Sequence, residues 1–112
     1  LKDGKVRLAL GAPGGTTITM GVLQGILNVV DFNMSAQHAV SAPRICVTSN
    51  KIEISNRIFR SVERELWDMG YSTYRNPASF INPRVHAIRI NEGDLDGGAD
   101  PIGDGMSGEV EF

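Results

Sequence analysis

The sequence has little of several features that mark whole classes of protein. Its one cysteine, Cys46, cannot form a disulfide within the chain, and its place in the apolar run RICV predicts a buried small side chain, not a reactive thiol. No stretch approaches the roughly 20 apolar residues that a membrane-spanning helix needs. The 11 basic and 13 acidic residues are interleaved to a net charge of -2, which offers no basic surface to nucleic acid.

The sequence also has no lysine between Lys5 and Lys51, which bears on the glycine-rich segment GAPGGTT, residues 11–17. A phosphate-binding P-loop needs a lysine directly after its last glycine, and a dinucleotide fingerprint needs a GxGxxG spacing that this segment lacks. Nucleotide hydrolysis of the P-loop kind is therefore disfavoured. Two interpretations of the segment stay open: a simple tight turn, which is the commoner use of Gly-Pro clusters, or an oxyanion hole made of glycine N–H groups.

At 112 residues the chain is the size of one small domain, or a piece of a larger one. No charged, apolar and small-residue leader opens it, so any export signal would lie on a longer precursor. Periodicity, capping residues and turn residues predict the following elements: a strand over 5–10, a helix over 16–32, a helix after Ser35 that Pro43 stops, a hairpin over 44–55, a helix from Asn56 to Gly70, strands over 71–75 and 84–90, and a glycine- and aspartate-rich loop before a short final strand.

The two long helices carry different expectations. Residues 16–32 are apolar on most sides, so we expect this helix to be buried in a larger body, with Gly21 and Gly25 allowing close approach of a neighbour. If the chain is isolated, the exposed apolar helix should cause self-association or dye binding. In the helix over 56–70, Ile58, Val62, Leu66 and Met69 form the apolar stripe, and the charged residues, Arg57 and Glu63 among them, are expected to face solvent.

The remaining polar candidates receive structural interpretations. His86 shares a predicted strand face with Ile88 and Ile90, which favours a hydrogen-bonded core histidine over a catalytic base. His38 is expected on a helix surface. The run DLDGGADPIGDG departs from the EF-hand pattern, so no metal site is expected, and its aspartates, Asp94, Asp96, Asp100 and Asp104, are expected to cap turns.

Three separated segments resemble motifs of one enzyme family. Residues 11–18, GAPGGTTI, are similar to the Gly-Ser-Pro-Gly-Gly segment of the γ-glutamyltranspeptidases. Residues 24–45, ending in Ala-Pro-Arg, resemble the next two helices of that family, and residues 97–108, GGADPIGDGMSG, resemble its Asp-Pro-Arg-x-Asp-Gly signature. The order and spacing agree along nearly the whole chain, which is therefore identified as a member of the family.

The resemblance implies both a fold and a chemistry. The family belongs to the N-terminal-nucleophile hydrolases, which implies an α+β fold and, for residues 1–112, a single domain that is a fragment of a four-layer αββα sandwich. The chain would be the C-terminal portion of a small subunit, and its partners would be the rest of that subunit and the large subunit. The whole enzyme would transfer or hydrolyse γ-glutamyl groups from glutathione or a related donor, with no cofactor, and Gly14 and Gly15 would be its oxyanion hole and substrate contact.

The resemblance also shows departures. The family's threonine nucleophile, exposed when a precursor cleaves itself, precedes the segments matched here, so the isolated chain is expected to be inactive on γ-glutamyl substrates. Ala12 stands where the family usually has serine, Ile102 and Gly103 replace basic residues, and ICVTSN replaces a segment in which many relatives carry histidines. The alternative is a stand-alone structural or binding domain of the same ancestry. A periplasmic or secreted location is suggested by the resemblance alone.

Overall fold

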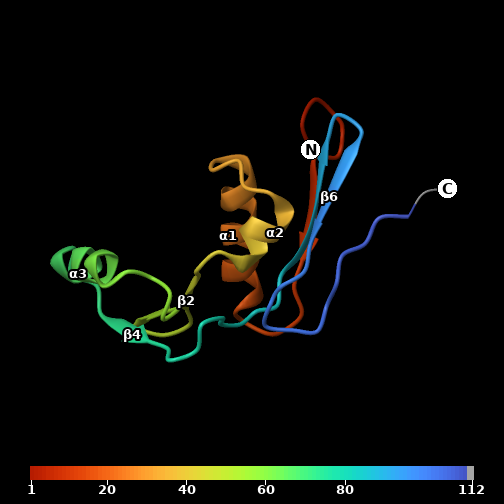
Figure 1. The fold of residues 1–112 in the computed structure, drawn as a ribbon. Coiled ribbons are helices and arrows are strands. Elements are labelled where there is room, and N and C mark those ends of the chain that lie inside the picture. The colour runs from red at the N-terminus through yellow and green to blue at the C-terminus, as the bar shows by residue number, and fades with distance from the viewer. Residues whose placement is uncertain (111–112) are drawn as a thin grey trace.

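The computed structural model describes residues 1–110, which form an elongated body of 51 × 31 × 24 Å. The elements follow the order β1 (Leu8–Gly11), α1 (Ile18–Val30), α2 (Ala36–Ser41), β2 (Ile45–Val47), β3 (Ile52–Ile54), α3 (Arg60–Asp68), β4 (Thr73–Arg75), β5 (His86–Asn91) and β6 (Asp94–Gly98). Two three-stranded sheets lie toward opposite ends of the molecule, with α1 and α2 between them (Figure 1). Within residues 1–110, no helix combines the length and the apolar character needed to cross a membrane.

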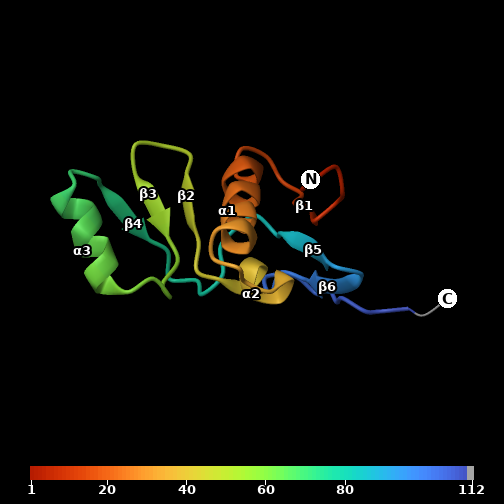
Figure 2. The ribbon, with the colours of Figure 1, turned by 90° about the horizontal axis from the view of Figure 1, so that it is seen from above.

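The sheet nearer both termini has the order β1-β5-β6 and is antiparallel throughout. Helices α1 and α2 cover one face of this sheet (Figure 2). The core between sheet and helices consists of Ala36, Val40, Val85 and Ala87, with Leu8, Leu10 and Ala12 packed against it. The predicted strand before the glycines, the helix after them and the Ser35 cap are confirmed; the Ser35 hydroxyl accepts a hydrogen bond from the His38 N–H at 3.1 Å.

The two glycines of α1 provide the close approach that the sequence predicts. A Cβ on Gly21 would lie 2.3 Å from Pro83 Cγ, and a Cβ on Gly25 would lie 2.9 Å from Leu10 Cδ1. Both glycines are buried. They therefore let the helix backbone rest directly on β1 and on the segment that leads into β5.

Helix α1 differs from expectation in the face it buries. Its polar residues point inward: the Gln24 side chain bonds to the backbone of Ile45, and the Asn28 amide donates to the Ala39 carbonyl at 3.1 Å. Several of its apolar side chains are left between 37% and 66% exposed, namely Leu23, Ile26, Leu27 and Val30. Full burial of this helix is thus not reached within residues 1–110, and the helix presents an apolar surface.

The second sheet has the order β2-β3-β4. The predicted β2–β3 hairpin is confirmed, and α3 connects β3 to the parallel strand β4. The predicted start of α3 is wrong: the helix begins at Arg60 with Phe59 as its N-cap, because the preceding residues form a separate turn in which the Ile58 N–H donates to the Ser55 carbonyl at 3.1 Å. Its predicted end is confirmed, with Gly70 at a φ of 94°.

The expectation that every charged residue of α3 faces solvent is wrong for Glu63, which is 4% exposed. Its carboxylate accepts hydrogen bonds from Arg75 Nη2 at 2.7 Å and from the Thr73 hydroxyl at 2.9 Å, both on β4. Arg57, which precedes the helix, is also engaged, since its guanidinium lies 4.1 Å from the centroid of the Phe80 ring. The apolar stripe is only partly covered, because Val62 and Met69 are exposed.

The Glu63–Arg75 contact predicts a pH dependence of stability. Hydrogen bonding from Arg75 holds the pKa of Glu63 below its ordinary value of 4.5, although burial opposes this shift. Because the folded-state pKa is the lower one, the stabilisation is complete above the ordinary value and is lost as the pH falls through the folded-state pKa. We therefore expect Glu63→Gln to lower the melting temperature at pH 7 and to have a smaller effect at about pH 3. A thermal scan at both pH values checks this, and an equal loss at both would contradict it.

The C-terminal third contains a strand that the sequence pattern does not predict. Residues 94–98, which the pattern assigns to a loop, form β6, whereas residues 109–110 form no strand, and the end of the predicted final strand lies outside the described residues. His86 is exposed, so the core-histidine prediction is wrong; His38 is exposed as expected. Of the aspartates, Asp100 does cap a turn by accepting from the Ile102 N–H at 3.0 Å. Asp96 instead accepts from the distant Ala36 N–H at 2.8 Å.

Strand β6 approaches α2 so closely that only glycine fits at Gly98. A Cβ there would lie 2.5 Å from both the carbonyl carbon and oxygen of Ala36, which are backbone atoms that cannot rotate away. We expect Gly98→Ala to destabilise the chain by about 3 kcal/mol, the upper end of the usual cost of overpacking. Gly11→Ala is the matched control, because a Cβ at Gly11 would meet nothing within 4 Å. Urea denaturation should separate the two variants, and equal midpoints would contradict the steric argument.

Candidate functional site

The candidate site is the loop of residues 12–17 that joins the end of β1 to the start of α1. Both Gly14 and Gly15 are exposed at the surface of this loop. The Gly15 carbonyl accepts a hydrogen bond from the Ile18 N–H at 3.2 Å, which fixes the loop against the first turn of α1. The loop therefore stands at the N-terminal end of a 13-residue helix, where the helix dipole is positive.

The N–H groups of Gly14 and Gly15 are available to a ligand. Within residues 1–110, neither N–H donates a hydrogen bond to a backbone or side-chain acceptor. Adjacent, unpaired backbone donors at the mouth of a helix are suited to hold an oxygen that carries negative charge. The loop thus offers two neighbouring backbone donors without a partner in the described part of the chain.

The two glycines meet different structural demands. Gly14 has a φ of 132°, a backbone conformation that side chains disfavour, so this position requires glycine for the path of the chain. Gly15 has no such φ, and nothing lies within 4 Å of a Cβ placed on it. A side chain at Gly15 would therefore be compatible with the fold, because its Cβ would meet open space.

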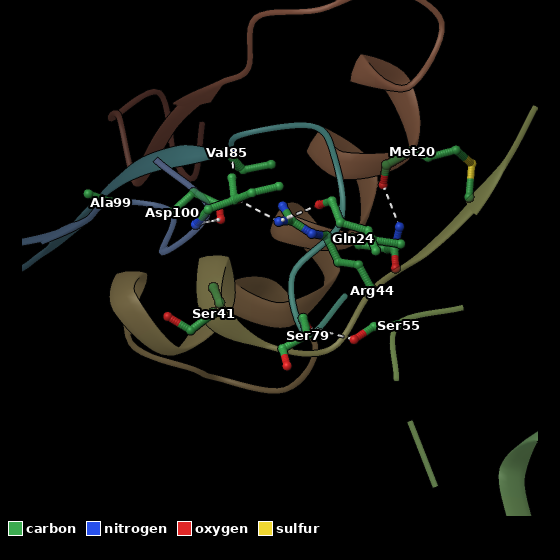
Figure 3. Close-up of polar contacts among 12 residues, drawn as sticks. Met20, Gln24, Ser41, Arg44, Ser55, Ser79, Val85, Ala99 and Asp100 are labelled. Atoms are coloured by element: carbon green, nitrogen blue, oxygen red, sulfur yellow. Dashed lines mark hydrogen bonds and ion pairs between the residues drawn. The ribbon is translucent and has the colours of Figure 1, made fainter. Parts of the chain in front are cut away.

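A buried ion pair lies between the two sheets and joins segments far apart in the sequence. The Arg44 guanidinium donates to Asp100 at 2.5 Å, and the exposed fractions of the two side chains are 4% and 0% (Figure 3). The same carboxylate oxygen accepts from the Val85 N–H at 2.9 Å, and Arg44 also donates to the Ile81 carbonyl at 3.2 Å. Local sequence patterns do not predict this pair, since they assign Asp100 only to the cap of a turn.

A second contact joins helix α1 to the second sheet, where a side-chain amide takes the place of a neighbouring strand. Gln24 of α1 donates to the Ile45 carbonyl at 2.7 Å and accepts from the Ile45 N–H at 2.9 Å, as a neighbouring strand would. The Gln24 amide thereby satisfies the backbone carbonyl and N–H of Ile45 on the outer edge of β2. Together with the Arg44–Asp100 pair, this contact fixes α1, and with it the glycine loop, relative to both sheets.

The other candidate groups do not form a catalytic cluster in the part of the chain that the structure describes. Cys46 is buried. Its burial, and to a smaller extent the negative charge of Glu53, raises the pKa of its thiol, so the thiol stays protonated and inert. The prediction of a buried small side chain at this position is confirmed. No group of three or more histidine, cysteine, aspartate or glutamate side chains in residues 1–110 is placed to hold a metal ion.

Comparison with known proteins gives consistent matches along this chain. The family model for gamma-glutamyltranspeptidase matches residues 1–110. The Acylase ACY 1 proenzyme of Pseudomonas sp. (strain SE83) is 36% identical over 100 residues, which are 88% of this chain and 18% of the relative. The Glutathione hydrolase proenzyme of Bacillus subtilis (strain 168) is 32% identical over 107 residues, which are 95% of this chain and 18% of the relative. The chain thus spans less than a fifth of the length of these curated relatives.

Solved structures agree with the sequence matches. The gamma-glutamyltranspeptidase from Pseudomonas nitroreducens has a TM-score of 0.82 at 31% identity, over 99% of this chain and 59% of that chain. A mutant of the Helicobacter pylori gamma-glutamyltranspeptidase has a TM-score of 0.79 at 36% identity, over 90% of this chain and 56% of that chain. The mixed α and β architecture is accordingly part of the N-terminal-nucleophile hydrolase fold. On its sequence, its fold and the family model together, the chain belongs to the gamma-glutamyltranspeptidase family.

Proposed function

We propose that this chain is the C-terminal part of the small subunit of an enzyme that transfers or hydrolyses γ-glutamyl groups, and that Gly14 and Gly15 form its oxyanion hole. The observation that carries the proposal is the pair of unpaired N–H groups at the mouth of α1. That loop is also the segment that resembles the family's Gly-Gly motif.

The chemistry follows from the loop and from a nucleophile supplied elsewhere in the small subunit. A threonine hydroxyl, with its own free amine as base, attacks the γ-glutamyl carbonyl of glutathione or a related donor. The carbonyl oxygen gains negative charge, and the N–H groups of Gly14 and Gly15 stabilise it. Collapse of the intermediate expels the amine and leaves an acyl-threonine, which water or an acceptor amine then resolves. The chain by itself has the oxyanion donors only, so we expect it to be inactive and, with α1 uncovered, to self-associate.

A second candidate is hydrolysis of an amide that carries no glutamyl group. This candidate rests on one observation, the 36% identity to a protein named an acylase proenzyme, which equals the 36% identity to the Helicobacter pylori gamma-glutamyltranspeptidase. Both candidates use the same oxyanion loop and differ in the acyl group that is bound.

A substrate comparison with the full-length parent protein tests the proposal. We expect a γ-glutamyl anilide to be turned over at a rate at least about 100-fold above that of an anilide with an aliphatic acyl group, because a site built for the charged glutamyl group rejects an acyl group that leaves its polar partners unpaired. The reverse preference would establish the acylase alternative. A processed, folded parent that turns over neither compound would favour the non-catalytic domain.

A further inference from the structure

Thr17 is the residue at which α1 begins, and its hydroxyl does not cap the helix. A threonine in this position ordinarily has an extended backbone and accepts a hydrogen bond from an N–H group of the first turn. Thr17 instead has helical backbone angles, a φ of -77° and a ψ of -16°, and makes no side-chain cap hydrogen bond. Its hydroxyl therefore does not stabilise the start of the helix.

The same chain contains a helix start at which a hydroxyl does cap. Ser35 precedes α2 with an extended backbone, a φ of -60° and a ψ of 161°, and its hydroxyl accepts a hydrogen bond from the His38 N–H. Thr17 has neither the extended backbone nor the hydrogen bond. The Thr17 hydroxyl is thus left without the role that the Ser35 hydroxyl has.

The Thr17 hydroxyl lies beside the glycine loop. Its Oγ1 atom is 3.6 Å from the place that a Cβ on Gly14 would take, and Ile18 Cγ1 is 3.8 Å from that place. Thr17 is partly buried, and within residues 1–110 its hydroxyl makes no hydrogen bond. The side chain thus places one polar atom, without a partner in the described part of the chain, next to Gly14.

The surroundings of this hydroxyl favour an anionic ligand. The N–H groups of Gly14 and Gly15 are unpaired within residues 1–110, and the first turn of α1 has no acidic residue that would offset the positive end of the helix dipole. A hydroxyl can donate as well as accept a hydrogen bond. Because the unpaired backbone groups beside it are donors, an acceptor that binds them can also receive a hydrogen bond from Thr17.

We propose that the Thr17 hydroxyl is a third oxyanion donor beside the N–H groups of Gly14 and Gly15, an inference that rests on the proposed function. The hydroxyl keeps its proton and donates a hydrogen bond to the carbonyl oxygen of the acyl group under attack. That oxygen is neutral in the bound substrate and negatively charged in the tetrahedral intermediate, and a hydrogen bond to a charged acceptor is about twice as strong. The contribution of Thr17 therefore falls on the acylation rate and not on substrate affinity.

Acylation of the full-length parent by a γ-glutamyl anilide tests this role. Thr17→Val exchanges the hydroxyl for a methyl group, and we expect acylation at saturating substrate to fall at least about tenfold while KM changes by less than about twofold. Thr17→Ser keeps the hydroxyl and should acylate within about threefold of the wild type. Thr16→Val is the matched control and should leave acylation unchanged, because Thr16 is exposed and has no atom within 4 Å of the Cβ position at Gly14.

Binding of a boronic acid analogue of the γ-glutamyl group gives a second measurement. The threonine nucleophile adds to the boron and passes its proton to its own amine, which leaves a tetrahedral anion in the place of the intermediate. Thr17→Val should weaken this binding about tenfold and leave the binding of glutamate, which forms no such adduct, unchanged. Equal weakening of both ligands would indicate a structural role for Thr17 and would overturn the inference.

The variants also separate this inference from the proposed function. Wild-type acylation in Thr17→Val, or equal losses in Thr17→Val and Thr17→Ser, would overturn the third donor. If Gly15→Val loses acylation and Thr17→Val does not, the third donor fails and the oxyanion hole of Gly14 and Gly15 stands. If both variants fold and acylate at the wild-type rate, the oxyanion hole fails together with the third donor.

Discussion

Asp100→Ala is expected to destabilise the chain by about 3–5 kcal/mol, the cost of leaving one member of a buried ion pair without its partner. The Arg44 side chain is 4% exposed, so water cannot replace the missing carboxylate without opening the structure. The loss reaches beyond the ion pair, because Asp100 also accepts hydrogen bonds from the backbone of Val85 and Ile102. The free energy of unfolding from urea titration gives the measurement.

Two further variants make this prediction specific. Asp104→Ala alters an exposed aspartate in the same loop and should change stability by less than about 0.5 kcal/mol. The double variant Arg44→Met with Asp100→Leu should recover only part of the loss: apolar residues of similar volume often replace a buried ion pair without cost, but leucine leaves the Val85 and Ile102 N–H groups without their acceptor. If Asp100→Ala is no more destabilising than Asp104→Ala, the pair does not fasten the two sheets together.

The elements that could be predicted from the sequence are those that local signals define. The Ser35 cap, the Gly70 terminus and the apolar alternation on each side of Asn50 all act within a few residues, and each is found at its predicted place. The role of Gly21 and Gly25 in α1 could also be predicted, because small residues four positions apart on an apolar helix usually allow close packing of a neighbour.

The features that the sequence analysis does not find depend on partners distant in the chain. Strand β6 contains Asp94, Gly97 and Gly98, residue types that disfavour strands. It forms because it pairs with β5. Gly98 is needed there because α2 leaves no room for a side chain. Helical periodicity assigns Glu63 to solvent because it contains no information about Arg75, its partner on β4. For the same reason the ion pair between Arg44 and Asp100, which are 56 residues apart, is not predictable from local patterns.

The candidate site is located by resemblance, because the physical pattern alone favours a simple turn. The structure adds an observation that the pattern could not provide: Gly14 requires glycine for its backbone conformation, whereas Gly15 does not. A binding role for the unpaired N–H groups would explain why glycine occupies position 15, where the fold does not require it.

Gly15→Val should therefore reduce acylation far more than stability. In the parent protein we expect the acylation rate to fall by about 10²- to 10³-fold, the range found when an oxyanion donor is lost, because the valine side chain occupies the space where the substrate carbonyl would meet the N–H groups. Stability should change little, since nothing lies within 4 Å of the new Cβ. Gly108→Val is the matched control, because its Cβ also meets nothing within 4 Å, and it should leave acylation unchanged.

The measurement that tests the oxyanion-hole assignment most directly is pre-steady-state acylation by a γ-glutamyl anilide, made on the same samples whose unfolding midpoints are determined. The proposed role of Gly15 predicts a Gly15→Val parent with an unfolding midpoint within about 2 °C of the wild type and with acylation reduced at least about 100-fold. A folded Gly15→Val parent that acylates at the wild-type rate would contradict that role and leave the loop of residues 12–17 as a simple turn.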